Sequence, residues 1–158
     1  MRADRRVLIV GFGNRLAGDD GAGPEVVRLL HAGGLPPAVR AEEGGSDSLR
    51  LPGLWEGEPR VWLVDAVDAG ALPGTIHRLA HDEVLAIPQK HATVHLLSLP
   101  ESLRWIGLSY PEMKAVRYRL WGIEPERVAL GADISSVVAV AVLDLAEEIR
   151  ASAAALAT

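Results

Sequence analysis

The sequence contains no cysteine. This absence excludes disulfide bonds, thiol nucleophiles, iron–sulfur clusters and thiolate zinc sites on this chain. Any metal ion would have to be bound by carboxylates, imidazoles or backbone oxygens.

Positive charge and long apolar runs are also scarce. Sixteen Lys and Arg residues stand against 21 Asp and Glu, which gives a formal net charge of −5. This charge disfavours a nucleic-acid partner. The apolar run Val7–Val10 is too short for a signal peptide, and no run approaches the ~18 residues of a membrane span. We therefore expect a cytoplasmic protein without membrane partners, and a monomer that forms transient complexes.

The order of apolar segments predicts an α/β fold. At 158 residues, the chain has about the length of one domain, so we expect a single domain over residues 1–158 with a frayed end at 151–158. Apolar, β-branched runs alternate with helical periodicity, which favours a mostly parallel sheet covered on both faces. The ten residues 65–74 are too few for a parallel crossover, so one strand should be antiparallel. The predicted strands are Val7–Val10, Val39–Glu42, Val61–Val64, Thr75–Leu79 and Val116–Trp121, and the predicted helices cover about 23–31, 98–108 and 135–155, with a possible short helix at 48–54.

Acidic residues follow two of the predicted parallel strands. The first strand leads into a glycine-rich loop, residues 11–23, that contains Asp19 and Asp20, and the third strand ends at Asp65. Ligands of open α/β sheets bind outside the carboxyl ends of the strands. If these strands are neighbours, the carboxylates share one crevice, where two acids are costly without a cation or a proton.

Structural roles fit the same residues. Asp19 or Asp20 could cap a helix within the glycine turn, and Asp65 could bind loop amides. The loop does not match a dinucleotide-binding fingerprint, because Leu16 occupies the position of its third glycine. Five histidines occur, at positions 31, 77, 81, 91 and 95, and nothing in their spacing separates a ligand from a structural histidine.

Several motifs together resemble the hydrogenase maturation endopeptidases. The most specific is Gly11-x-Gly13-Asn14-x-Leu16-x-Gly18-Asp19-Asp20-Gly21-x-Gly23, which is similar to the signature loop of that family. The other motifs follow in the family's order along nearly the whole chain: Glu43-Gly44-Gly45-Ser46, Val64-Asp65-Ala66-Val67-Asp68, Pro73-Gly74-Thr75-Ile76, His95-x-x-Ser98-Leu99-Pro100-Glu101 and Gly122-Ile123-Glu124-Pro125.

The resemblance implies a fold, an activity and a site. The fold is a three-layer α/β/α sandwich with a twisted five-stranded sheet that contains one antiparallel strand. The activity is that of an aspartic-type endopeptidase that removes the C-terminal extension of a [NiFe] hydrogenase large-subunit precursor after nickel insertion. The residues that contact the metal correspond to Asp20, Asp65 and His95, where the first position is Glu or Asp in the family. The nickel arrives on the substrate, held there by thiolates, so this chain needs no cysteine.

These implications lead to specific hypotheses. Asp20, Asp65 and His95 would recognise the nickel centre, and one of the carboxylates would activate water as a general base. Gly44, Gly45 and Ser46 would allow a substrate segment to approach closely. Asp19 would bind the backbone amides of the loop, and Asn14 would shape the same turn. The alternatives are a non-catalytic module that binds a divalent metal and a metallohydrolase that carries its own ion; a nucleotide-binding domain is disfavoured by Leu16.

Overall fold

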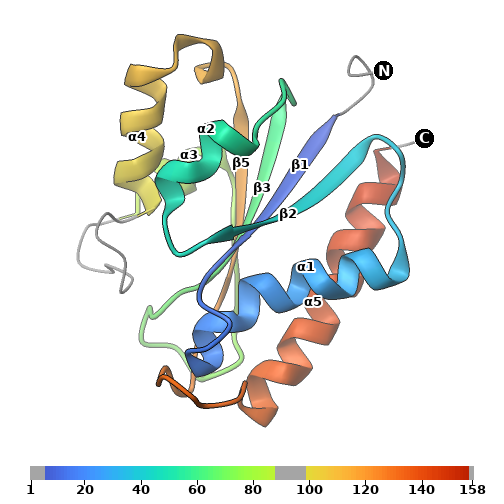
Figure 1. Cartoon of the computed structure of the whole chain (residues 1–158), viewed down its shortest axis with the longest axis vertical. Helices are drawn as coiled ribbons and strands as arrows, with labels where there is room; N and C mark the ends of the chain where they lie inside the picture. Colours follow the sequence, from blue (N-terminus) through green and yellow to red (C-terminus); the bar gives the residue numbers. More distant parts are fainter. Residues whose placement is uncertain (1–5, 88–98, 157–158) are drawn as a thin grey trace.

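The computed structural model describes residues 6–87 and 99–156. Five strands form one twisted sheet in the order β2-β1-β3-β5-β4 (Figure 1). The strands are β1 (Val7–Phe12), β2 (Val39–Gly45), β3 (Arg60–Ala66), β4 (Ile76–Leu79) and β5 (Arg117–Ile123). The α/β fold with one antiparallel strand is therefore as predicted.

The pairing of the strands explains which loops meet. Strand β1 pairs in parallel with both β2 and β3, and β3 pairs in parallel with β5. Strand β4 follows β3 in the sequence but pairs antiparallel with β5 at the edge of the sheet. The carboxyl ends of β1, β3 and β5 consequently lie at the same end of the sheet.

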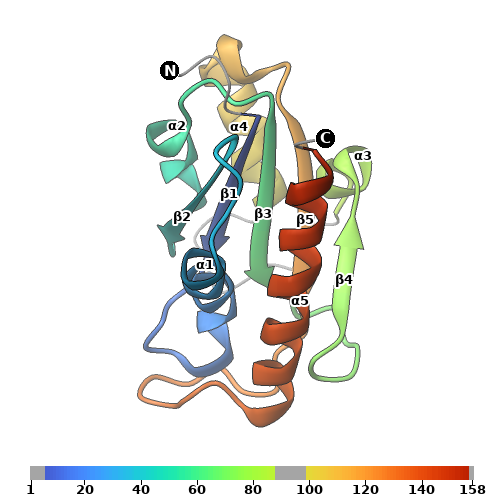
Figure 2. The same ribbon diagram turned by 90° about the vertical axis from the view of Figure 1, so that its right-hand side faces the viewer.

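Helices cover both faces. On one face lie α1 (Ala22–Gly33) and α5 (Ser136–Ala155), and on the other lie α2 (Leu51–Leu54), α3 (His81–Leu85) and α4 (Leu99–Ser109), as Figures 1 and 2 show. The remaining helices are the 3-10 turns η2 (Gly18–Gly21), η3 (Ser48–Arg50) and η5 (Pro111–Met113). Each face of the sheet has its own apolar core, which is why β1 and most of β3 are buried on both sides.

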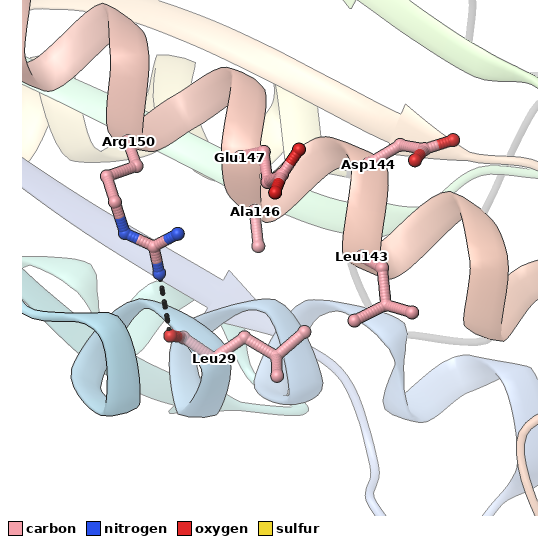
Figure 3. A pocket seen from close by; sticks show the side chains of 6 residues that line it. All are labelled: Leu29, Leu143, Asp144, Ala146, Glu147 and Arg150. Carbon is pink, nitrogen blue, oxygen red and sulfur yellow. Dashed lines mark hydrogen bonds between the residues drawn. The ribbon is translucent and has the colours of Figure 1, made fainter.

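Helices α1 and α5 pack side by side over one core. Arg150 of α5 donates a hydrogen bond to the carbonyl oxygen of Leu29 in α1 at 2.9 Å, beside a shallow pocket of about 320 Å³ (Figure 3). Helix α5 continues to Ala155, within the segment 151–158 for which the sequence predicts fraying. The reason is packing, because Ala153 is fully buried in the core beneath the helix.

The sequence patterns located most elements to within one or two residues. Helix α3 and the 3-10 turns η2 and η5 were not predicted, because they are too short to show a period. Ser98, where the helix predicted over about 98–108 begins, lies outside the described residues. Within residues 6–87 and 99–156, no helix combines the length and the apolar character that crossing a bilayer requires.

Candidate active site

The glycine-rich loop brings the start of α1 against the end of β1. A Cβ atom at Gly11 would collide with the carbonyl oxygen of Gly23, and one at Gly23 would collide with the carbonyl oxygens of Phe12 and Val64. Gly13 has a φ of +139°, which side chains rarely allow. The glycines therefore permit backbone to pack on backbone, and this packing places η2 beside the end of β3.

Asp20 and Asp65 meet at this point. Asp20 is 8% exposed and its Oδ2 accepts a hydrogen bond from the Asn14 amide at 2.9 Å. Asp65 is 3% exposed and its Oδ1 accepts a hydrogen bond from the Ala66 amide at 2.8 Å. Within the described residues, the second oxygen of each carboxylate has no hydrogen-bond donor, so each carboxylate keeps an oxygen for another ligand. The two carboxylates lie close enough to interact electrostatically, and a ligand crevice shared by them stays a prediction.

The environment of Asp65 favours its protonated form. Burial raises the pKa of the Asp65 carboxyl well above its ordinary value, and the negative charge of Asp20 raises it further. The hydrogen bond from Ala66 acts in the opposite direction and does not cancel these effects. Two buried carboxylates that repel each other form a site that a cation would stabilise.

Asp19 binds backbone amides, as predicted, but these amides belong to the β5–α5 connection and not to the glycine-rich loop. Its carboxylate accepts hydrogen bonds from the amides of Glu126 and Arg127 at 2.8 and 2.9 Å, and from the amide and hydroxyl of Ser135 at 2.7 and 2.9 Å. Ser135 is the N-cap residue of α5, so the charge also lies at the positive end of that helix. Asp19 therefore joins η2 to the β5–α5 connection rather than binding amides of its own loop.

Asn14 shapes the glycine-rich loop as predicted, since its Oδ1 accepts a hydrogen bond from the Leu16 amide at 2.9 Å. The loop is also tied to β2, because Arg15 Nε donates to Glu43 Oε2 at 3.2 Å. This contact joins the glycine-rich loop to the carboxyl end of β2.

Gly44 and Gly45 lie at that end of β2. A Cβ atom at Gly44 would collide with the ring of Phe12, so core packing alone explains this glycine. Gly45 has a φ of +68°, and its carbonyl oxygen accepts a hydrogen bond from the Gly13 amide at 2.9 Å. Ser46 is exposed. Packing and backbone conformation therefore explain the two glycines, and the contact of this segment with a substrate stays a prediction.

Glu124 is a residue whose role the sequence reasoning missed. It is buried, and its carboxylate accepts hydrogen bonds from the amides of Ala69 and Gly70 at 3.0 Å and is 2.8 Å from His77 Nε2. It thereby holds the loop that follows Asp65. An acidic residue just after a predicted strand could have indicated such a role. The partners of Glu124 could not be identified from the sequence, because they lie about 50 residues away.

The described histidines all have structural partners. The Nε2 atom of His31 is 2.7 Å from the Ala41 carbonyl, His77 contacts Glu124, and His81 Nδ1 accepts a hydrogen bond from the Tyr118 amide at 2.9 Å. His91 and His95 lie outside the described residues. Among the residues that are described, no cluster of three potential ligands could hold a metal ion.

Comparisons with known proteins identify the family of this chain. Residues 24–152 match the model of the hydrogenase maturation protease family. The chain belongs to this family. The matched residues include Asp65 and position 95, whereas Asp20 precedes them.

Individual family members support the assignment. The chain is 30% identical over 150 residues to the hydrogenase expression/formation protein HoxM of Cupriavidus necator, which covers 90% of this chain and 71% of that protein. It is 42% identical over 83 residues to HupD of Rhodobacter capsulatus, which covers 51% of this chain and only 39% of that protein. The [NiFe] hydrogenase maturation protease HybD from Thermococcus kodakarensis has a similar structure, with a TM-score of 0.78 at 26% identity over 94% of this chain and 99% of that one.

Proposed function

We propose that this protein is an endopeptidase that removes the C-terminal extension of a nickel-loaded [NiFe] hydrogenase large-subunit precursor. Its membership of the hydrogenase maturation protease family supports this activity and a large-subunit substrate. The observation that carries the proposal is the buried pair of carboxylates, Asp20 and Asp65, at the carboxyl ends of two neighbouring parallel strands.

The pair suits recognition of a cation that comes with the substrate. In the free protein, protonation of Asp65 relieves the repulsion between the carboxylates. A nickel centre entering the crevice would take the place of this proton, and His95 would complete a set of two carboxylates and one imidazole. Nickel is in this proposal part of the substrate, so cleavage would follow only after nickel insertion. One of the carboxylates would then take a proton from the attacking water.

Two features around the pair fit a polypeptide substrate. Strand β2 is an edge strand, and its carboxyl end at Gly44, Gly45 and Ser46 is linked to the glycine-rich loop. An extended substrate segment could add to such an edge by backbone hydrogen bonds. The second feature is a contact between the glycine-rich loop and the β5–α5 connection, in which the Gly131 amide donates a hydrogen bond to the Leu16 carbonyl at 2.8 Å. The side chains of Leu16 and Leu130 in these two loops are 71% and 81% exposed. This apolar rim offers contact area to a protein substrate.

The decisive experiment measures cleavage of nickel-loaded and nickel-free precursor by the wild type and by Asp20→Asn, Asp65→Asn and His95→Ala. We expect cleavage only of the nickel-loaded precursor, and a loss of at least a hundredfold in each variant. Asp144→Asn is the matched control, because Asp144 is an exposed carboxylate on α5. Cleavage that is indifferent to nickel, or unimpaired in all three variants, would contradict the proposal.

The same assay separates the alternatives. A metallohydrolase with its own ion would lose activity on chelation and regain it with zinc on a nickel-free peptide. A non-catalytic module would bind nickel or zinc stably in isolation and cleave no precursor. Sedimentation of the free protein tests the expectation of a monomer.

A further inference from the structure

A second cavity lies at the opposite end of the sheet from Asp20 and Asp65. It has a volume of about 500 Å³ and is lined by the first residues of β3 and β5, the end of β4, the start of α3 and the end of α5. Figure 2 shows these elements together, away from the loop between β5 and α5. Arg60 lines the cavity and is the first residue of β3, whereas Asp65 is the sixth. At a rise of ~3.3 Å per residue, these two residues are about 16 Å apart along the strand.

The cavity is strongly basic, although the chain carries a net charge of −5. Four arginines line it: Arg60, Arg78, Arg117 and Arg119. Among the described residues that line the cavity, the one carboxylate is Glu83, and its Oε1 accepts a hydrogen bond from the Ala80 amide at 3.2 Å. Within this set of described residues, the positive charge of the arginines is therefore not balanced.

Two of these arginines oppose each other directly. Arg60 and Arg117 are partners in the register of β3 and β5, and both are exposed. Like charges at directly opposite positions destabilise a sheet. Within residues 6–87 and 99–156, neither guanidinium has a hydrogen-bond or ion-pair partner. An anion between the two side chains would replace this repulsion with attraction.

A third arginine is held in place by aromatic rings. The Arg119 guanidinium lies 4.2 Å from the centroid of Trp121 and 5.9 Å from that of Trp62, which is opposite Arg119 in the register. Stacking restricts the guanidinium before any ligand arrives and so lowers the entropy cost of binding. Glu148 accepts hydrogen bonds of 2.8 and 2.7 Å from Arg78 and also attracts the charge of Arg119. Arg78 and Arg119 are therefore partly neutralised, whereas Arg60 and Arg117 have no such partner among the described residues.

We propose that this cavity binds the carboxylate groups of an acidic peptide segment through Arg60, Arg117 and Arg119. Guanidinium groups pair with carboxylates through two parallel hydrogen bonds. The apolar lining of Leu79 and Leu156 suits the aliphatic parts of a peptide. A phosphate site would instead be expected to use backbone amides of a glycine-rich turn, and none of the described residues that line this cavity is a glycine.

The proposal is tested by titrating the full chain with a blocked hexaglutamate peptide at low salt, using tryptophan fluorescence, because Trp62 lines the cavity and Trp121 contacts Arg119. Binding should saturate with one peptide per chain, and blocked hexaglutamine should not bind. Arg60→Ser/Arg117→Ser should weaken binding at least tenfold. The matched control, Arg28→Ser/Arg104→Ser, removes the same charge from α1 and α4 and should change binding less than twofold.

Each contrary result overturns the proposal. Equal weakening in the two double variants would show nonspecific attraction, and absence of saturation with the wild type would show that there is no site. Tighter binding of inorganic pyrophosphate than of hexaglutamate would identify a phosphate site instead. Arg119→Lys keeps the charge but loses the planar guanidinium, so unchanged binding in this variant would also count against the proposed pairing. None of these measurements depends on peptidase activity.

Discussion

Asp19 and Ser135 lie 116 positions apart in the sequence and are joined by two hydrogen bonds, from the amide and from the hydroxyl of Ser135. The same carboxylate accepts the amides of Glu126 and Arg127. These bonds hold η2 against the start of α5, and η2 carries Asp20. The position of a proposed site residue thus depends on its neighbour in the sequence, which has no contact with substrate in this scheme.

Replacing Asp19 with Asn should destabilise the protein by about 2–4 kcal/mol at pH 7, because charged hydrogen bonds are lost and buried amides lose an acceptor. Burial raises the pKa of Asp19, but the hydrogen bonds from Arg127, Ser135 and Glu126 outweigh it and leave the pKa below its ordinary value of 3.8. The contribution of the charge is therefore complete above that value and is lost as the pH falls below it.

Urea unfolding of the wild type and Asp19→Asn at pH 7, 4 and 3 measures this effect. The difference between the two proteins should shrink at the lowest pH. Asp144→Asn should match the wild type within about 0.5 kcal/mol, as expected for an exposed position. A difference between wild type and Asp19→Asn that stays constant with pH would contradict the assigned role of the charge.

Asp65→Asn should have the opposite effect on stability. The pKa of Asp65 is raised in the folded protein, so folding stability falls as the pH rises from the ordinary value of 3.8 to the folded pKa, and the loss is complete above it. The amide oxygen of Asn can still accept the Ala66 hydrogen bond, and no charge opposes Asp20. We expect Asp65→Asn to be more stable by about 1–2 kcal/mol at pH 8 while precursor cleavage is lost. The gain should vanish below pH ~4, where Asp65 is protonated in both the folded and the unfolded state. Thermal unfolding that gives a less stable variant at pH 8 would contradict this prediction.

Gly23→Ala should disrupt the acidic site from a distance. The new methyl group would collide with the backbone oxygens of Phe12 and Val64, which cannot move without shifting β1 or β3. We expect a loss of about 3 kcal/mol or more. Gly107→Ala is the control, since it lies in α4 with open space around it and should be neutral or stabilising by about 0.5–1 kcal/mol. Similar unfolding midpoints for the two variants would refute the close approach as the reason for Gly23.

Glu124→Gln should loosen the loop after Asp65 without unfolding the protein. The amides of Ala69 and Gly70 both donate to Oε1 of the carboxylate, and Oε2 is 2.8 Å from His77 Nε2. Gln keeps one acceptor oxygen but loses the negative charge and the second acceptor, so these hydrogen bonds become weaker. We expect faster hydrogen exchange at these two amides and a lower kcat for precursor cleavage, with exchange in β1 unchanged. Unaltered protection at Ala69 and Gly70 would show that Glu124 does not hold the loop.

Local patterns predict much of this molecule. Apolar β-branched runs such as Val61–Val64 form strands because their side chains are buried on both faces, and the short connection at 65–74 correctly predicts a reversed strand. The glycine-rich loop with Asp19 and Asp20 could also be placed at a strand end. The position of β4 beside β5 could not be predicted, because strand pairing depends on contacts between segments distant in the sequence.

The chemical character of the acidic site depends on the amino-acid sequence and on the tertiary structure. The amino-acid order alone supplies carboxylates after two strands whose carboxyl ends a parallel sheet sends to one edge. That β1 and β3 are neighbours is decided by the tertiary structure. Residue chemistry alone does not distinguish Asp19 from Asp20, because they are identical neighbours, and only the family resemblance assigns Asp20 to the site and Asp19 to backbone amides. Folding turns one toward amides more than 100 residues away and the other toward β3. Burial and long-range hydrogen bonds thus give the two residues different roles, and neither effect is a property of the local sequence.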